Sequence, residues 1–385
     1  MFRVVSMFLL LLGAANGQSP WLDLRGNGVL TWTNASPAGR FSLEWTPRLD
    51  GGWRAWDFYQ DSPMTAQVMN IEVPMYFRVS VRTNQSKFVP PDGKILMMIG
   101  QDTNNINRYV EIATNEPGGV MIYTSVQLAD GLTSRHEDGG GPQFGQYLAD
   151  RYSNSVIQVG LYMVNALLDV LLGDYDANID FIGNWMANTH RPVFLRIGYE
   201  FDASWTDYDP FLYQEVFRYI VNRYNAAGIT NVAYVWHSQA APVRAALMEW
   251  YPGDAYVDWV AASVFGSPSS NNRSNLVAVA ELARQLGKPF MIAEASPHGI
   301  SATNGVTSWV KWYEPTFEFI RDYDVKAFCY INCDWNGPEM WQFNTSGWGD
   351  ARIQYGSITK PLWLQQMAHT NFLHASTNLF HRLGY

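Results

Sequence analysis

Two glutamates, each at the end of a short apolar run, have the residue type and the setting for acid–base chemistry. Glu200 ends the run in RPVFLRIGYEFD (Arg191–Asp202), and Glu294 ends the run in PFMIAEASP. Such runs indicate strands that are covered on both faces. Two carboxyl groups that face each other across a cleft can cleave a glycosidic bond, because one protonates the leaving oxygen while the other attacks or activates water. We therefore predict that Glu200 and Glu294 form a catalytic pair.

An arginine lies four residues before the first glutamate. Strand alternation places Arg196, Gly198 and Glu200 on one face, with Arg196 one layer deeper. A buried charge is costly unless it is paired, and an opposite charge lowers the pKa of a carboxyl group. We expect Arg196 to act mainly on Glu294, so that this side chain stays ionised while Glu200 stays protonated.

These residues need a scaffold that brings distant strands to one place. From Lys94 onward, segments with helical spacing, such as Phe211–Ala227, alternate with eight apolar runs, at residues 95–102, 120–126, 156–164, 192–200, 232–238, 257–266, 289–296 and 325–335. This order predicts an α/β fold, a (β/α)8 TIM barrel, in which strands four and seven end at one mouth. A doubly wound sheet is the alternative, but no glycine-rich phosphate loop follows an early strand.

Further side chains at the predicted strand ends and in the loop after Glu200 suit a sugar site. Indole rings at a barrel mouth can stack on pyranose rings. The candidate substrate-binding residues are Arg196, Tyr199, Trp205, His237, Trp335, Asp102 and Trp341. Two have equally good structural interpretations, since Asp102 could cap a helix and His237 could be a core histidine. The long, glycine-rich connection Asp130–Arg151 is expected to wall one end of the cleft.

The chain divides into four predicted parts. Residues 1–17 have the pattern of a secretory signal peptide, with Arg3, an apolar run and small residues. Residues 18–83 read as a small antiparallel β domain that resembles a fibronectin type III module. Residues 84–93 are polar and proline-rich, which predicts a linker, and residues 94–385 form the barrel, ending in a helix over Pro361–Phe380.

Composition restricts the partners. The net charge of −9, without a basic run, argues against nucleic acid and anionic membranes. Aromatic residues make up 15% of the chain, which suits either a tryptophan-rich core or stacking on sugars. The two cysteines, Cys329 and Cys333, predict buried free thiols, and neither they nor the histidines show metal-site spacing, so no cofactor is expected. Sequons at Asn34, Asn84, Asn272 and Asn344 allow glycosylation on a secretory route.

Segments across residues 94–345 resemble family 26 of the glycoside hydrolases, the β-mannanases and β-1,3-xylanases. The segments that carry the resemblance are LRIGYE, YQEVFRYIVNRYNAAGITNVAYVW, YPGDAYVDWVAASVF and GKPFMIAEAS. The resemblance implies Glu200 as acid/base, Glu294 as nucleophile, and a secreted retaining enzyme acting on a β-linked polysaccharide, with β-mannan expected first and β-1,3-xylan next. Tyr199 and Phe265 depart from the family's usual His and Tyr. Either another donor serves Glu294, with His237 and Tyr330 as the candidates, or the subfamily differs in substrate.

Two other functions compete with this one. A catalytically inactive carbohydrate-binding protein would keep the barrel and the aromatic cleft, but it would have no need of both glutamates. A metal-dependent esterase would need clustered metal ligands, and the seven histidines are scattered along the chain.

Overall fold

The computed structural model describes residues 86–138, 140–240, 247–269, 273–337 and 347–385, and the backbone of six strands between Leu22 and Arg82. The chain forms two compact units. The first consists of Met1–Gln85 and the short segment Gln285–Gly287, and the second consists of Ser86–Arg284 and Lys288–Tyr385. The predicted signal peptide, the four sequons and Trp341 lie outside the described residues.

The first unit contains only short strands among its described residues: β1 (Leu22–Leu24), β2 (Val29–Trp32), β3 (Arg40–Thr46), β4 (Arg54–Ala55), β5 (Gln67–Val68) and β6 (Tyr76–Arg82). They pair antiparallel in the orders β1-β2-β5 and β4-β3-β6. Whether this unit as a whole has a fibronectin type III-like fold stays a prediction.

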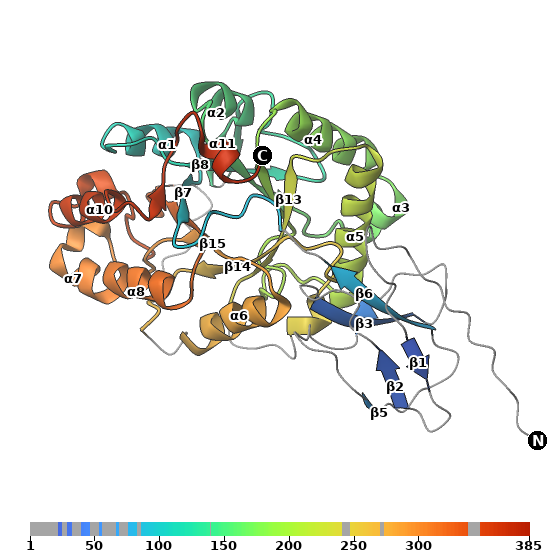
Figure 1. Ribbon diagram of the computed structural model, residues 1–385. Coiled ribbons are helices and arrows are strands. Elements are labelled where there is room, and N and C mark those ends of the chain that lie inside the picture. Colours follow the sequence, from blue (N-terminus) through green and yellow to red (C-terminus); the bar gives the residue numbers. More distant parts are fainter. Residues whose placement is uncertain are drawn as a thin grey trace, which may run out of the picture. The chain divides into compact units, whose positions relative to one another are not determined.

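The second unit is built on eight parallel strands that close into a barrel (Figure 1). They are β7 (Ile95–Gly100), β8 (Gly119–Ser125), β11 (Val156–Tyr162), β12 (Val193–Ile197), β13 (Val232–Ser238), β14 (Trp259–Val264), β15 (Phe290–Ala295) and β16 (Ala327–Ile331). Each pairs with the next, and β16 pairs with β7, for instance at Cys329 and Met98. The predicted (β/α)8 barrel is confirmed, with every predicted strand in place.

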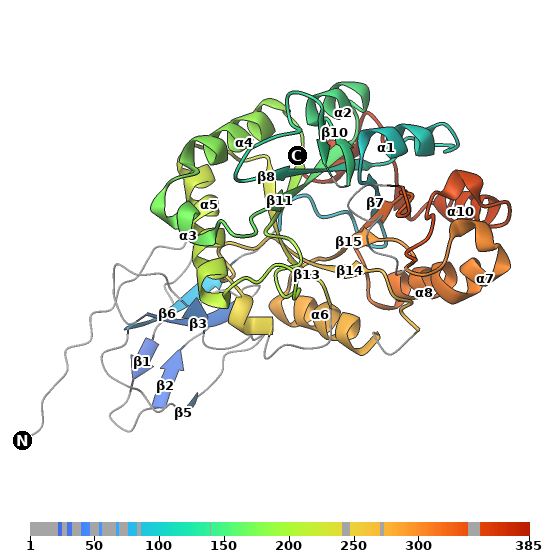
Figure 2. The ribbon, with the colours of Figure 1, turned by 180° about the vertical axis from the view of Figure 1, so that it is seen from behind.

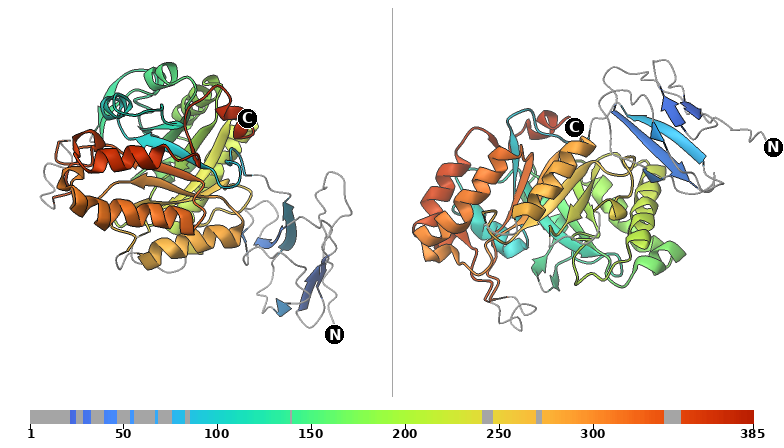
Figure 3. Two further views of the ribbon diagram at one scale, coloured as in Figure 1. Left: turned by 60° about the vertical axis from the view of Figure 1, so that its left-hand side comes forward. Right: turned by 90° about the horizontal axis from the view of Figure 1, so that it is seen from below.

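Helices cover the outside of the barrel, as Figures 1 and 2 show. They are α1 (Thr103–Val110), α2 (Gly145–Arg151), α3 (Leu167–Leu172), α4 (Asp176–Asn188), α5 (Pro210–Ala226), α6 (Arg273–Leu286), α7 (Val306–Ser308), α8 (Glu314–Asp322), α10 (Thr359–Met367) and α11 (Leu379–Arg382). The helix predicted over Phe211–Ala227 is α5, which begins at Pro210 because Asp209 caps it by accepting from Leu212 N at 2.9 Å. Helices α6 and α8, both orange in Figure 3, lie side by side and are joined by the Arg273–Asp322 ion pair.

The single C-terminal helix predicted over Pro361–Phe380 is wrong beyond Met367. Helix α10 ends there, and Phe372–Leu373 forms β17, which pairs parallel with β7. Both β17 side chains are buried, whereas the preceding His369–Asn371 is polar and more exposed. The apolar pair at residues 372–373 is therefore used to extend the sheet rather than a helix face.

The predicted linker belongs to the barrel unit from Ser86 onward. Lys87 Nζ donates to the carbonyl of Val232 at 2.7 Å, and Trp259 Nε1 donates to the carbonyl of Lys87 at 2.8 Å. Phe88 is buried against the ring of Phe194. These contacts fix residues 87–88 to the starts of three barrel strands, so they are not a free connection.

The barrel core absorbs much of the aromatic content. The largest fully buried side chains include Trp236, Trp259, Trp312 and Trp363. Cys329 and Cys333 are buried free thiols, as predicted. No helix in the described part of the chain is long and apolar enough to cross a bilayer.

Candidate active site

The floor of the site is Arg196, on the buried strand β12. Its register partner on β11 is Gly160. A Cβ on Gly160 would lie 2.5 Å from Tyr123 Cδ1 and 2.7 Å from Arg196 Nη2. Gly160 therefore leaves the room in which the guanidinium and the phenol ring pack, and the Arg196 Cζ atom lies 5.1 Å from the ring centre of Tyr123.

Glu200 reaches the site through a turn, not through strand alternation. Strand β12 ends at Ile197, and Gly198 (φ 55°) and Glu200 (φ 53°) both have left-handed backbone conformations. The turn is tied to the neighbouring strand by Phe201 N, which donates to the carbonyl of His237 at 3.2 Å. A left-handed glutamate is uncommon, and such backbone strain often occurs at functional sites.

Glu294 lies inside β15, next to a bulge. Ala262 pairs with Ile292 and Ser263 with Glu294, so Ala293 is the extra residue. The carbonyl of Ala293 accepts instead from Gln158 Nε2 at 2.9 Å, across the barrel interior. Bulges re-aim side chains, and here the bulge sets the direction of Glu294.

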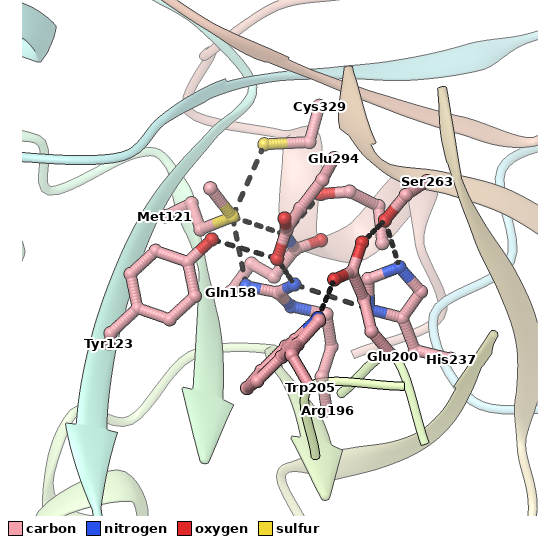
Figure 4. A network of polar contacts seen from close by, with 11 residues as sticks. Met121, Tyr123, Gln158, Arg196, Glu200, Trp205, His237, Ser263, Glu294 and Cys329 are labelled. Carbon is pink, nitrogen blue, oxygen red and sulfur yellow. Dashed lines mark hydrogen bonds and ion pairs between the residues drawn. The ribbon is translucent and has the colours of Figure 1, made fainter. Parts of the chain in front are cut away.

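The Glu294 carboxylate accepts from two donors on its Oε1 atom. Arg196 Nη1 forms a buried ion pair with it, and the hydroxyl of Tyr123 donates to it at 2.7 Å (Figure 4). Burial is the largest single effect on Arg196 and lowers the pKa of its guanidinium, but Glu294 and Tyr123 together raise that pKa above its ordinary value. Tyr123 is thus the second donor to Glu294, beside Arg196. Of the two predicted donors, Tyr330 instead donates to the carbonyl of Ala351, and His237 lies beside Glu200.

The donors to the Glu200 carboxyl group in the described part of the chain are both neutral. Ser263 Oγ donates to its Oε1 at 2.5 Å, and Trp205 Nε1 donates to its Oε2 at 3.2 Å. The side chain is buried, with 5% of the residue exposed. Burial, and next the negative charge of Glu294, raise the pKa of Glu200 to about 8. Glu200 is therefore protonated at neutral pH, as a general acid must be.

His237 joins the two halves of the site. Its Nδ1 lies 3.3 Å from Arg196 Nη1, and its Nε2 lies 3.0 Å from Ser263 Oγ. The ring is fully buried, and burial, then the charge of Arg196, lower its pKa well below the ordinary value. Figure 4 shows the resulting network, in which Arg196 contacts both Glu294 and His237.

An aromatic platform borders the carboxyl groups. Trp205 is 44% exposed and stacks on Tyr162, with ring centres 6.4 Å apart and planes 13° apart. Tyr199 lies between this ring and the ring of Tyr123, at 6.0 and 5.2 Å. Trp205 therefore presents an open face beside Glu200 while its N–H holds the carboxyl group, which suits contact with a sugar ring.

The remaining predicted residues are less directly placed. Asp102 caps α1, accepting from the amides of Asn104 and Asn105 at 3.0 Å. Trp335 is only 3% exposed and donates to Ser296 Oγ at 2.9 Å, so its ring is packed rather than open to a ligand.

A pocket of about 280 Å³ opens on the Ser263 side of the site. Its lining comes from the ends of β13 and β14, the loop after β14, helix α6 and two later loops: Gln239, Ala240, Ser263, Val264, Phe265, Gly266, Ser267, Pro268, Leu276, His298 and Trp348. Ser263 therefore belongs both to this pocket and to the hydrogen-bond network of Glu200.

The connection Asp130–Arg151 is more ordered than its glycine content suggests. It contains the hairpin of β9 (His136–Asp138) and β10 (Gly141–Gln143), followed by α2. Gln143 Oε1 accepts from Tyr123 N at 3.0 Å, and Gly140 O accepts from Gln101 at 3.2 Å. The hairpin thus rests on the ends of β7 and β8. In the described part of the chain, no cluster of His, Cys, Asp or Glu could hold a metal ion.

Sequence reasoning missed Tyr123, Ser263 and Gln158. Ser263 is the polar residue of an otherwise apolar β14, Tyr123 follows the apolar run Val120–Ile122 in β8, and Gln158 is a lone amide in β11. Polar side chains inside otherwise apolar barrel strands are the signal that could have found them, because a buried polar group needs a partner.

The fold and site together define a glycoside hydrolase built on a (β/α)8 barrel, and the comparisons give its family. The family model for glycosyl hydrolase family 26 matches residues 136–333. A β-1,3-xylanase from Alcaligenes sp is 31% identical over 330 residues, covering 80% of this chain and 70% of the relative. The β-1,3-xylanase TXYA from Vibrio sp is 32% identical over 323 residues, covering 78% and 70%. The chain belongs to glycosyl hydrolase family 26.

Solved structures share the fold at lower identity. A family 26 β-mannanase from Bacteroides ovatus has a TM-score of 0.55 at 15% identity, covering 75% of this chain and 93% of that chain. An endo-β-1,4-mannanase double mutant from Cellulomonas fimi has a TM-score of 0.54 at 19% identity, covering 75% and 74%. These likenesses show the barrel fold alone.

Proposed function

We propose that this chain is a secreted, retaining β-1,3-xylanase with Glu200 as acid/base and Glu294 as nucleophile. The observation that carries the proposal is the difference between the surroundings of the two glutamates. Arg196 and Tyr123 contact Glu294, while Glu200 accepts from the neutral Ser263 and Trp205 and has a raised pKa. Retaining glycosidases need one carboxylate that attacks and one carboxyl group that donates a proton.

The reaction follows from these roles. In the first step a Glu294 carboxylate oxygen bonds to the anomeric carbon, the glycosidic C–O bond breaks, and the Glu200 proton passes to the leaving oxygen. In the second step Glu200, now a carboxylate, takes a proton from water as the water oxygen bonds to the anomeric carbon and releases Glu294. The two inversions give net retention.

We propose β-1,3-xylan, rather than the β-mannan first expected from the sequence, as the substrate. The two β-1,3-xylanases are 31% and 32% identical over about four fifths of this chain. The mannanase structures fall below 20% identity and support the fold only. Tyr199, immediately before the acid/base, is also a departure from the histidine expected of the family. Secretion rests on residues 1–17 alone, whose apolar run suits a cleaved signal peptide.

The test is product release from β-1,3-xylan, β-1,4-xylan and β-mannan by the purified protein, with the anomer of the first product read by NMR. We expect xylo-oligosaccharides of retained β-configuration from β-1,3-xylan. Glu294→Ala should lower kcat by at least about 10⁴-fold, since the nucleophile is lost. Glu281→Ala, an exposed ion-pair partner of Arg284 on α6, is the control and should match wild type.

Each part of the proposal has its own contrary result. Release from β-mannan alone would overturn the substrate, and an α-configured first product would overturn retention. Binding of one polysaccharide without any product would support the inactive carbohydrate-binding alternative.

A further inference from the structure

A chain of hydrogen bonds runs from Arg196 through His237 and Ser263 to Glu200, and the direction of each bond is fixed. A guanidinium can only donate, so His237 Nδ1, 3.3 Å from Arg196 Nη1, must accept. The proton of the neutral imidazole is then on Nε2, 3.0 Å from Ser263 Oγ. The neighbours of His237 thus select one of its two tautomers.

The same logic continues to the acid/base. Ser263 Oγ accepts from His237 Nε2, so its single hydroxyl proton is free to point at Glu200 Oε1, 2.5 Å away. The carbonyl oxygen of a protonated carboxyl group accepts hydrogen bonds better than its O–H oxygen does. Oε1 accepts the shorter bond, 2.5 Å from Ser263, and Oε2 the longer one, 3.2 Å from Trp205, so the unprotonated oxygen is Oε1.

We propose that His237 and Ser263 are positioning residues that keep the acid proton of Glu200 on Oε2, the oxygen beside Trp205. The inference rests on the proposed role of Glu200 as acid/base. Trp205 Nε1 donates to Oε2 at 3.2 Å, and a carboxylic O–H oxygen can still accept that bond while directing its own proton to a leaving oxygen. We call the chain Arg196–His237–Ser263–Glu200 the relay. Because it keeps the acid proton on Oε2, the leaving oxygen of the substrate must lie on the side of the exposed Trp205 ring.

The groups around Glu200 keep this arrangement over the working pH range. The charged or titratable side chains that act on it or on its relay are Tyr123, Arg196, Tyr199, Asp202, His237 and Glu294. Burial and Arg196 lower the pKa of His237, and burial raises the pKa of both tyrosines, so these rings stay neutral. Asp202 is engaged by Ser238 Oγ and the amide of Gln239, each at 2.6 Å.

The first experiment compares Ser263→Ala with wild type on two substrates. Hydrolysis of β-1,3-xylan, whose leaving group needs the proton, should fall about tenfold. Hydrolysis of a 2,4-dinitrophenyl β-xylo-oligoside, whose leaving group needs none, should stay within about twofold. The basic limb of the kcat/KM profile should move to higher pH, because Ser263 no longer donates to the ionised carboxylate.

Two matched variants separate positioning from stability. Ser263→Thr keeps the hydroxyl, and the pocket beside Ser263 has room for a methyl group, so the pH limb should stay in place. Ser155→Ala removes another buried hydroxyl, which donates to the carbonyl of Pro117 at 2.7 Å. This variant should change neither the rates on the two substrates nor the basic limb of the pH profile. An equal loss on both substrates with an unmoved limb for Ser263→Ala would overturn the proposal.

A second measurement needs no activity. The imidazole ¹⁵N shifts of His237, assigned by comparison with His237→Gln, should show the Nε2–H tautomer, and the Nε2 shift should change in Ser263→Ala. An Nδ1–H tautomer would overturn the relay. A protein with the Nε2–H tautomer that cleaves no glycan would overturn the proposed function and leave the relay standing.

Discussion

The surroundings of Glu294 and Glu200 differ although both glutamates are buried in one network. Glu294 accepts from a buried guanidinium and a phenol, while Glu200 accepts from a serine hydroxyl and an indole N–H. A full positive charge stabilises a carboxylate more than neutral donors do, and burial favours the neutral acid. The comparison teaches that neighbours on β8, β12 and β14 and in the loop after Glu200, rather than the glutamates themselves, assign the two roles.

The largest effect is expected when the positive charge beside Glu294 is removed. Arg196→Met leaves a buried carboxylate without its partner and should lower the free energy of unfolding by about 3–5 kcal/mol, measured by urea denaturation at pH 7. The double variant Arg196→Met/Glu294→Gln should recover most of this loss. Arg223→Met, which removes a half-exposed ion pair with Asp176 and Asp180, should cost about 1 kcal/mol or less. Equal stability of the single and double variants would contradict a charge effect.

The second substitution removes the neutral hydrogen-bond donor to Glu294. Tyr123→Phe keeps the ring that packs on Arg196 and Tyr199 but deletes the hydroxyl, 2.7 Å from the carboxylate. A lost hydrogen bond to a charged group should lower kcat about 10- to 100-fold with little change in KM. Tyr152→Phe, whose hydroxyl donates to Asn107 outside the site, is the control. A wild-type kcat for Tyr123→Phe would show that Arg196 alone holds the nucleophile.

The third prediction uses the raised pKa of Glu200. A carboxyl group with a higher pKa in the folded protein binds its proton more tightly there, so its contribution to stability is present at low pH and fades as pH rises toward about 8. Glu200→Gln removes this dependence. The unfolding free energy of the variant minus that of wild type should therefore increase by about 1–3 kcal/mol between pH 5 and pH 9. A difference that is constant with pH would mean that Glu200 titrates normally.

The sequence predicts the barrel and the two glutamates because both depend on local patterns. Eight apolar runs with helical segments between them allow few other folds, and each glutamate ends its run. The same patterns could not show the turn at Gly198, the bulge at Ala293 or the donor Tyr123, since these depend on how strands pair across the barrel. The C-terminal strand β17 was hidden for the same reason, because two apolar residues pair with β7 only in the folded chain.

The smallest and most discriminating change is at Trp205, the counterpart on Glu200 of Tyr123 on Glu294. Trp205→Phe keeps a ring against Tyr162 but loses the N–H that reaches Glu200 Oε2 at 3.2 Å. A lost neutral donor should lower kcat on xylan about two- to tenfold and move the basic limb to higher pH, because the donor favours the ionised form. Trp205→Leu should in addition raise KM, since the stacking face is lost. If Trp205→Phe lowers kcat more than Tyr123→Phe does, the acid rather than the nucleophile depends more on its hydrogen bonds, and the ranking of the two environments is reversed.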